Sequence, residues 1–181
     1  MKNFFLQPEN YKLKANSGFT LIELLLYVAV ASVMLLVISV FLSTLLESRI
    51  KNQTIAEVEQ QGLQVMQIIT QTARNAEAIS DPSAGESANE LTLDVVDASK
   101  DPTFFELSGG GVLLIKEGVG SQISLTNSRV TMSGFLVSNL SRASTPGTIR
   151  IQFTLTHTNP AGRNEYSFTK TFTGSATLRQ P

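Results

Sequence analysis

The sequence predicts an α+β protein, in which a long N-terminal helix packs on an antiparallel β-sheet. Residues 24–46 form an uninterrupted apolar run without a charged residue, proline or glycine. Apolar residues then recur at spacings of three and four as far as Ile79, which is typical of an amphipathic helix. Beyond Asn89 apolar and polar residues alternate, which is typical of β-strands with one buried face.

The first half of the predicted helix is long enough to cross a membrane. As a helix, the apolar run would extend roughly 35 Å, which exceeds the thickness of a bilayer core. We therefore predict a transmembrane helix over residues 19–50. Glu23 is a charged residue near the start of this apolar segment. A carboxylate there is costly unless it has a partner. This cost makes Glu23 a candidate functional residue.

The second half, over residues 51–80, is predicted to be an amphipathic continuation of the same helix. No proline interrupts residues 19–80, so a proline kink is not expected. The predicted apolar stripe consists of Ile55, Val58, Gly62, Val65, Met66, Ile69, Ala73, Ala76 and Ile79.

Residues 81–181 are predicted to form the sheet, and they pack with residues 51–80 as one small globular domain. The segment Asp81-Pro82-Ser83-Ala84-Gly85-Glu86-Ser87 has the composition of a loop. Strands are expected at 91–95, 103–107, 112–116, 123–125 and 130–137, with a bulge near Gly134. The second and third of these are expected to pair as a hairpin around the turn Ser108-Gly109-Gly110-Gly111. A last hairpin is expected between 149–155 and 166–172, with its turn at Asn159-Pro160-Ala161-Gly162. The sheet's apolar face is expected to cover the helical stripe.

Composition excludes several classes of site. The chain has no cysteine, so it contains no disulfide, thiolate metal site or cysteine nucleophile. With 14 basic and 15 acidic residues, it has a formal net charge of −1. No cluster of lysine and arginine along the sequence indicates a nucleic-acid surface.

Catalytic and metal-binding candidates are few. His157 is the only histidine, and no oriented partner for it is visible in the sequence. Asp94, Asp97 and Asp101 lie close enough in sequence to share a calcium ion, but their spacing fits no helix-loop-helix site, so solvated loop acids are the preferred interpretation. We expect no enzymatic activity, no cofactor and no metal.

The hexapeptide Gly18-Phe19-Thr20-Leu21-Ile22-Glu23 resembles the processing site of type IV pilins and type II secretion pseudopilins. The resemblance implies that a prepilin peptidase cuts between Gly18 and Phe19, that Phe19 becomes N-methylated, and that Glu23 serves filament assembly. Residues 1–18 would then be a leader peptide, and residues 19–50 would act first as an anchor and later as part of the filament core.

The leader differs from an ordinary secretory signal because its long apolar run follows the cut. Lys2, Lys12 and Lys14 precede the run, whereas Arg49 and Lys51 follow it, which favours a cytoplasmic N-terminus. We therefore expect a single-pass protein of the cytoplasmic membrane that later enters a pilus or pseudopilus.

The resemblance predicts a structural subunit whose partners are the peptidase, other pilins, the inner-membrane assembly platform and lipid. The absence of cysteine from the outer domain and its hairpin-rich sheet favour a minor rather than a major subunit. The Glu23 carboxylate would pair with the Phe19 amine of a neighbouring subunit or with that of its own chain. Two alternatives to a filament subunit remain: a bitopic protein with an extracellular binding domain, and a membrane-tethered enzyme.

Overall fold

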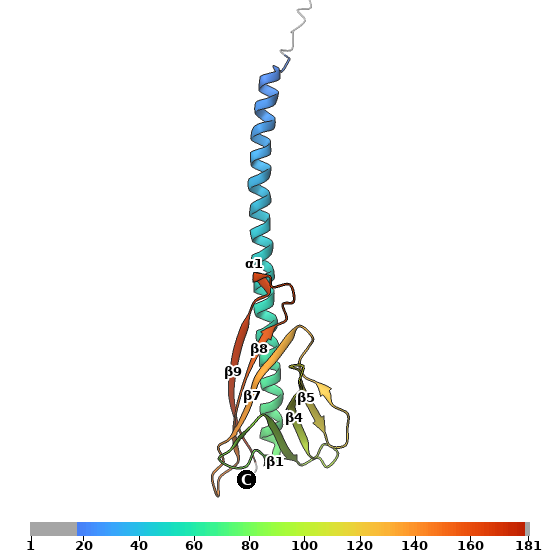
Figure 1. Ribbon diagram of the computed structural model, residues 1–181. Helices are drawn as coiled ribbons and strands as arrows, with labels where there is room; N and C mark the ends of the chain where they lie inside the picture. Colours follow the sequence, from blue (N-terminus) through green and yellow to red (C-terminus); the bar gives the residue numbers. More distant parts are fainter. Residues whose placement is uncertain (1–17, 180–181) are drawn as a thin grey trace, which may run out of the picture. The chain divides into compact units, whose positions relative to one another are not determined.

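The computed structural model describes residues 18–179, and the predicted leader lies outside them except for Gly18. The chain divides into two compact units, residues 1–44 and 45–181. One helix, α1 (Leu21–Asn75), contributes to both units. Nine strands follow it, all of them paired antiparallel, which confirms the α+β class (Figure 1).

In the first unit, α1 buries none of its large apolar side chains. Phe19, just before the helix, is 74% exposed, and the large apolar side chains of the helix are exposed from Leu21 to Leu42. In the second unit, every third or fourth residue of α1 is buried: Thr54, Val58, Gly62, Val65, Ile69 and Ala73. The predicted stripe is therefore confirmed in its central part. Thr54 was missed, and Ile55 and Met66 are only half-buried.

The helix ends at Asn75, whereas the sequence predicted that it would continue to about residue 80. Residues Ala76–Asp81 form strand β1, which pairs with β3 (Glu90–Val95) through Ile79 opposite Leu93. Register shifts lie on both sides of the Ala78–Asp94 and Ile79–Leu93 pairs, and they leave Ala76 buried and Ile79 half-buried. A helix would also give apolar residues at this spacing of three. Pairing with a strand distant in sequence decides the outcome.

A five-stranded sheet has the order β1-β3-β4-β5-β6. Strands β4 (Thr103–Leu107) and β5 (Leu113–Glu117) form the hairpin expected around the Ser108–Gly111 turn, and β6 (Ile123–Ser124) is a short edge strand. Leu91, Leu93, Phe105 and Leu113 point inward and are fully buried.

A four-stranded sheet has the order β2-β7-β8-β9. It consists of β2 (Ser87–Ala88), β7 (Val130–Asn139), β8 (Thr148–His157) and β9 (Thr169–Thr177). Gly134 has φ of 60° within a register shift of β7, which confirms the predicted bulge. Tyr166 was expected in the last strand but lies in the 3₁₀ helix η1 (Asn164–Tyr166).

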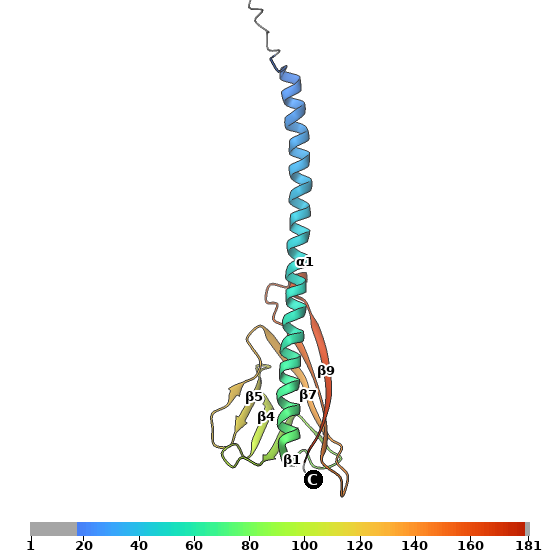
Figure 2. The ribbon, with the colours of Figure 1, turned by 180° about the vertical axis from the view of Figure 1, so that it is seen from behind.

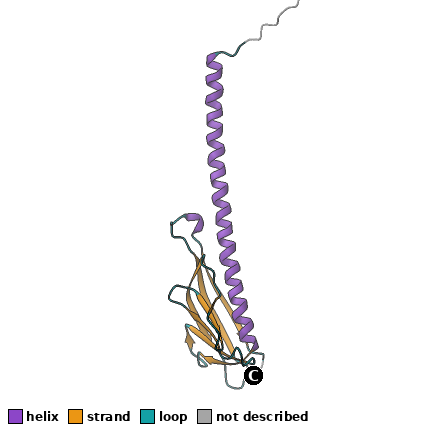
Figure 3. Ribbon diagram, turned by 90° about the vertical axis from the view of Figure 1, so that its right-hand side faces the viewer, coloured by secondary structure: helices purple, strands orange, loops and turns teal. Residues whose placement is uncertain are grey.

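The expectation of one sheet is therefore corrected to two, which share a core with α1. Figure 3 shows the strands on one side of the α1 segment that belongs to the second unit, and Figure 2 shows β9 and β5 toward opposite edges. Two glycines allow close approach of α1 to β9: Gly62 faces the ring of Phe172, and Gly174 faces the side chain of Met66. A Cβ atom at either glycine would collide with the facing side chain.

Candidate functional site

The predicted cleavage site lies immediately before the helix. Gly18, Phe19 and Thr20 are exposed and outside regular secondary structure, and the helix begins at Leu21. A Cβ atom built on Gly18 would have no neighbour within 4 Å, so packing among the described residues does not require a glycine here.

Thr20 caps the helix. Its Oγ1 accepts a hydrogen bond from the Glu23 backbone N–H at 3.3 Å, and its carbonyl accepts one from Leu24 at 3.1 Å. Threonine followed three residues later by glutamate is the signature of a helix N-terminus, and the sequence analysis overlooked it. The cap places Glu23 in the first turn of the helix, where the helix dipole favours a negative charge.

The Glu23 side chain has a partner in its own chain. The Tyr27 hydroxyl donates a hydrogen bond of 3.2 Å to Glu23 Oε1, one helical turn further on. The Phe19 ring meets the Tyr27 ring edge-on, with 6.0 Å between centroids. Sequence reasoning named Phe19 and Glu23 but missed Tyr27, although a spacing of four residues on a helix is the signal that could have found it. Glu23 Oε1 thus accepts a hydrogen bond from Tyr27. The pairing of Glu23 with a Phe19 amine stays a prediction.

The helix that follows carries the properties of a membrane anchor. It is long and apolar enough to span a bilayer, and none of its most apolar segment is buried in the protein. Since these side chains find no cover within their own unit, they are available to lipid or to other apolar helices.

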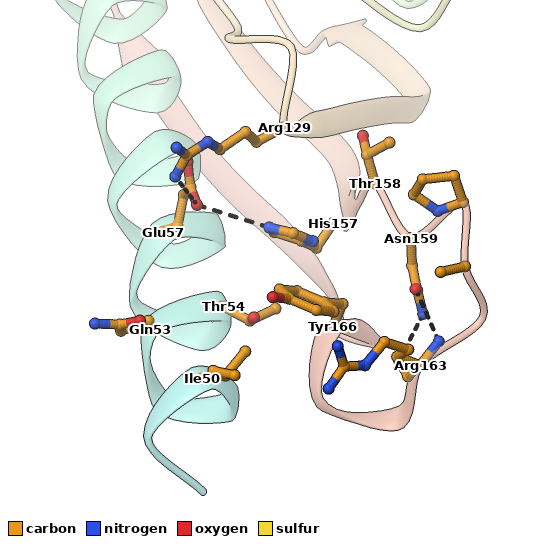
Figure 4. Close-up of a pocket in the computed structure, with 12 residues that line it drawn as sticks. Ile50, Gln53, Thr54, Glu57, Arg129, His157, Thr158, Asn159, Arg163 and Tyr166 are labelled. Carbon is orange, nitrogen blue, oxygen red and sulfur yellow. Dashed lines mark hydrogen bonds and ion pairs between the residues drawn. The ribbon is translucent and has the colours of Figure 1, made fainter. Parts of the chain in front are cut away.

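A second candidate site is a cavity of about 550 Å³ in the globular unit, between α1 and the β8–β9 loop. Figure 4 shows Glu57 of α1 reaching Arg129 and His157, with Tyr166 beside the imidazole. Glu57 Oε2 lies 3.4 Å from Arg129 Nη1 and 3.6 Å from His157 Nε2. Lys51 closes the same end of the loop by donating to the carbonyls of Asn164 and Ser167.

His157 is the last residue of β8, and its side chain is buried. Its ring stacks on Tyr166 with 5.7 Å between centroids, and its Nδ1 has no hydrogen-bond partner among the described residues. The Glu57–His157 contact joins helix to strand across about a hundred residues of chain. It holds the end of β8 on α1.

The three aspartates considered for calcium are not brought together. Asp94 accepts from the Ser80 hydroxyl, Asp101 from the Val95 N–H, and Asp97 from the Ser99 hydroxyl and N–H. The Ser99 hydroxyl, followed by the Ser99 N–H, lowers the pKa of Asp97 below its ordinary value. Across residues 18–179, no group of three histidine, aspartate or glutamate side chains is arranged to hold a metal ion.

Comparison with known proteins bears on the N-terminal segment. Residues 13–39 match the family model described as the prokaryotic N-terminal methylation motif, and the match contains Gly18, Phe19 and Glu23. No curated protein and no solved structure matches the chain. The chain thus carries the prepilin-type N-terminal methylation motif on a long apolar helix, an arrangement consistent with the type IV pilin and pseudopilin family.

Proposed function

We propose that this chain is a structural, non-enzymatic subunit of a type IV pilus or type II secretion pseudopilus. The observation that carries the proposal is the position of the methylation motif, directly before a helix whose apolar surface is uncovered. That surface serves two successive environments, the bilayer of the cytoplasmic membrane and the helical core of a filament.

The proposed sequence of events assigns a role to each motif residue. Prepilin peptidase cuts after Gly18 on the cytoplasmic side, and Phe19 becomes the methylated N-terminus. The assembly platform then moves the subunit from lipid into the filament among other pilins. The Glu23 carboxylate fixes the axial position of the subunit by pairing with a Phe19 amine, a charge-assisted contact that strengthens where water is excluded.

Intact-mass analysis of the protein from membranes of cells with an active prepilin peptidase tests the proposal. We expect loss of residues 1–18 and one added methyl group on Phe19. Gly18→Val should block the cut, because a β-branched side chain replaces a residue that has none. Protein that begins at Met1 under these conditions would support the bitopic alternative instead.

A further inference from the structure

Charge is divided unequally between the two halves of the globular unit. Residues 76–125, which contain all strands of the five-stranded sheet, have nine acidic and two basic residues, a net charge of −7. Residues 126–179, which contain β7, β8 and β9, have one acidic and six basic residues, a net charge of +5. Arg129 and Lys170 pair with Glu57 and Glu59 of α1, and Arg163 pairs with Glu165, so the basic residues that form no ion pair among the described residues of this half are Arg142, Arg150 and Arg179. The two halves therefore carry opposite charge.

The acidic region has an exposed face on β3 and β4. Glu90 and Glu106 alternate with buried residues, so both lie on the outer face of the sheet, and they are directly opposite each other across the two strands. Like charges in this arrangement repel. Neither carboxylate takes part in an ion pair within residues 18–179.

The same face is hollowed between these carboxylates. A cavity of about 170 Å³ is lined by Glu90, Phe104, Phe105, Glu106, Lys116 and Gln122, and the Gln122 amide donates a hydrogen bond to one Glu106 oxygen. Lys116 lies over the Phe104 ring, with its Nζ 6.0 Å from the centroid, and does not bridge either glutamate. Two carboxylates beside an aromatic ring suit a guanidinium group, which is planar, donates several hydrogen bonds and stacks on rings.

The basic region offers such groups at one end of its own sheet. Arg150 is exposed on the outer face of β8, Arg142 is exposed in the β7–β8 loop, and Arg179 is exposed after β9. None of the three makes an ion pair among the described residues. Glu86, whose backbone bonds to Asn139 at this end of the sheet, forms no ion pair with them either.

We propose that the β3–β4 face of one copy of this chain binds the Arg150 face of a second copy. The occupant is a second copy because the chain carries both halves of the charge match on different sheets. A contact between two different faces leaves one of each unused, so it can repeat from subunit to subunit and gives an open row unless the rotation between subunits closes a ring. The inference rests on the proposed function, to which it adds the faces by which neighbouring subunits recognise each other.

Crosslinking of the full-length chain in membranes tests the contact, and the absence of native cysteine makes it specific. Thr92→Cys lies on the β3 face near Glu90, and Gln152→Cys lies on the outer face of β8 near Arg150; both substitutions leave every charge in place. With a short bis-maleimide crosslinker, the double-cysteine chain should give a ladder of dimers, trimers and larger products. Either single-cysteine chain should give no product larger than a dimer.

Charge reversal in the double-cysteine chain separates recognition from folding. Glu106→Lys and Arg150→Glu should each lower the yield of the ladder by about tenfold. Their combination should restore it, because it exchanges the two charges between the faces. Asp97→Lys, which makes the same charge change in the β3–β4 loop, should leave the yield unaltered.

Absence of the ladder, a ladder insensitive to the single reversals, or crosslinks only to a different protein would each overturn the inference. The N-terminal mass of the same samples is read separately. Processed protein without a ladder refutes the contact alone, whereas unprocessed protein with a ladder refutes the proposed function and supports the contact.

Discussion

At the scale of single residues, the N-terminal motif combines a conformational signal with an unusual charge. Thr20 sets the start of the helix, and Tyr27 donates to the carboxylate of Glu23, which precedes the apolar run. Such a bond lowers the cost of keeping Glu23 in the helix while leaving its second oxygen for another donor. The geometry is therefore compatible with insertion of Glu23 before assembly.

We predict that Glu23→Gln will leave a processed, membrane-inserted protein that enters filaments poorly. Glutamine keeps the shape and the acceptor oxygen but removes the charge needed to pair with an amine. The measurement is the ratio of this protein in sheared filaments to that in membranes, at equal expression. Glu47→Gln, an exposed acid on the same helix, is the control. A ratio equal to wild type would show that the Glu23 charge does not place the subunit.

At the scale of elements, the packing of α1 against the two sheets stabilises the globular unit. Ile69 of α1 and Phe153 of β8 are both fully buried in the shared core. Replacing either by alanine should reduce the free energy of unfolding by about 2–5 kcal/mol. Leu63→Ala, at a helix position that is 64% exposed, should change it by less than about 0.5 kcal/mol. Urea unfolding of a fragment that begins at Lys51 measures all three, and equal effects at buried and exposed sites would contradict the assignment of faces.

Gly62 provides a second test of the same contact. Alanine favours a helix over glycine by about 1 kcal/mol, but its Cβ would collide with the Phe172 ring. Overpacking of this kind costs about 1–3 kcal/mol, so Gly62→Ala should destabilise the fragment on balance. The loss should shrink when Phe172→Leu is also present, because the two positions are coupled. A stabilised single variant would show that the ring moves aside freely.

At the scale of the whole molecule, exposed apolar surface is concentrated in one unit. Large exposed apolar residues are dense from Phe19 to Leu46, whereas the described residues after Lys51 include only six: Leu63, Val96, Val119, Ile123, Leu136 and Leu140. The second unit thus has the surface of a globular domain. The apolar stripe of its helix segment is already buried against the sheets.

We therefore predict that a fragment beginning at Lys51 will be soluble without detergent and will unfold cooperatively. A fragment beginning at Phe19 should require detergent, because it retains the uncovered apolar helix. Ultracentrifugation with and without detergent, followed by thermal circular dichroism, measures both properties. Sedimentation of the shorter fragment as aggregate would indicate that residues 19–50 are needed to complete the globular core.

Local patterns in the sequence were sufficient for much of this architecture. The spacing of apolar residues predicted the helix and its buried stripe, and alternation predicted the β4–β5 and β8–β9 hairpins with Phe153 inward. Gly134 marked the bulge. These features depend on neighbours within a few residues, which is why a sequence shows them directly. The methylation motif is also a local signal, because its residues are recognised from their order in the sequence alone.

Only the tertiary structure decided the features that depend on distant partners. Ala76–Asp81 became a strand because β3 offered it a ladder, and the β-region split into two sheets because β2 paired with β7 instead of extending the first sheet. His157 became a buried contact because the end of β8 meets Glu57 on α1. The hollow between Glu90 and Glu106 likewise exists only because two strands align those residues. Apolar spacing and residue type are the same in the competing conformations, so pairing across the chain selects among them.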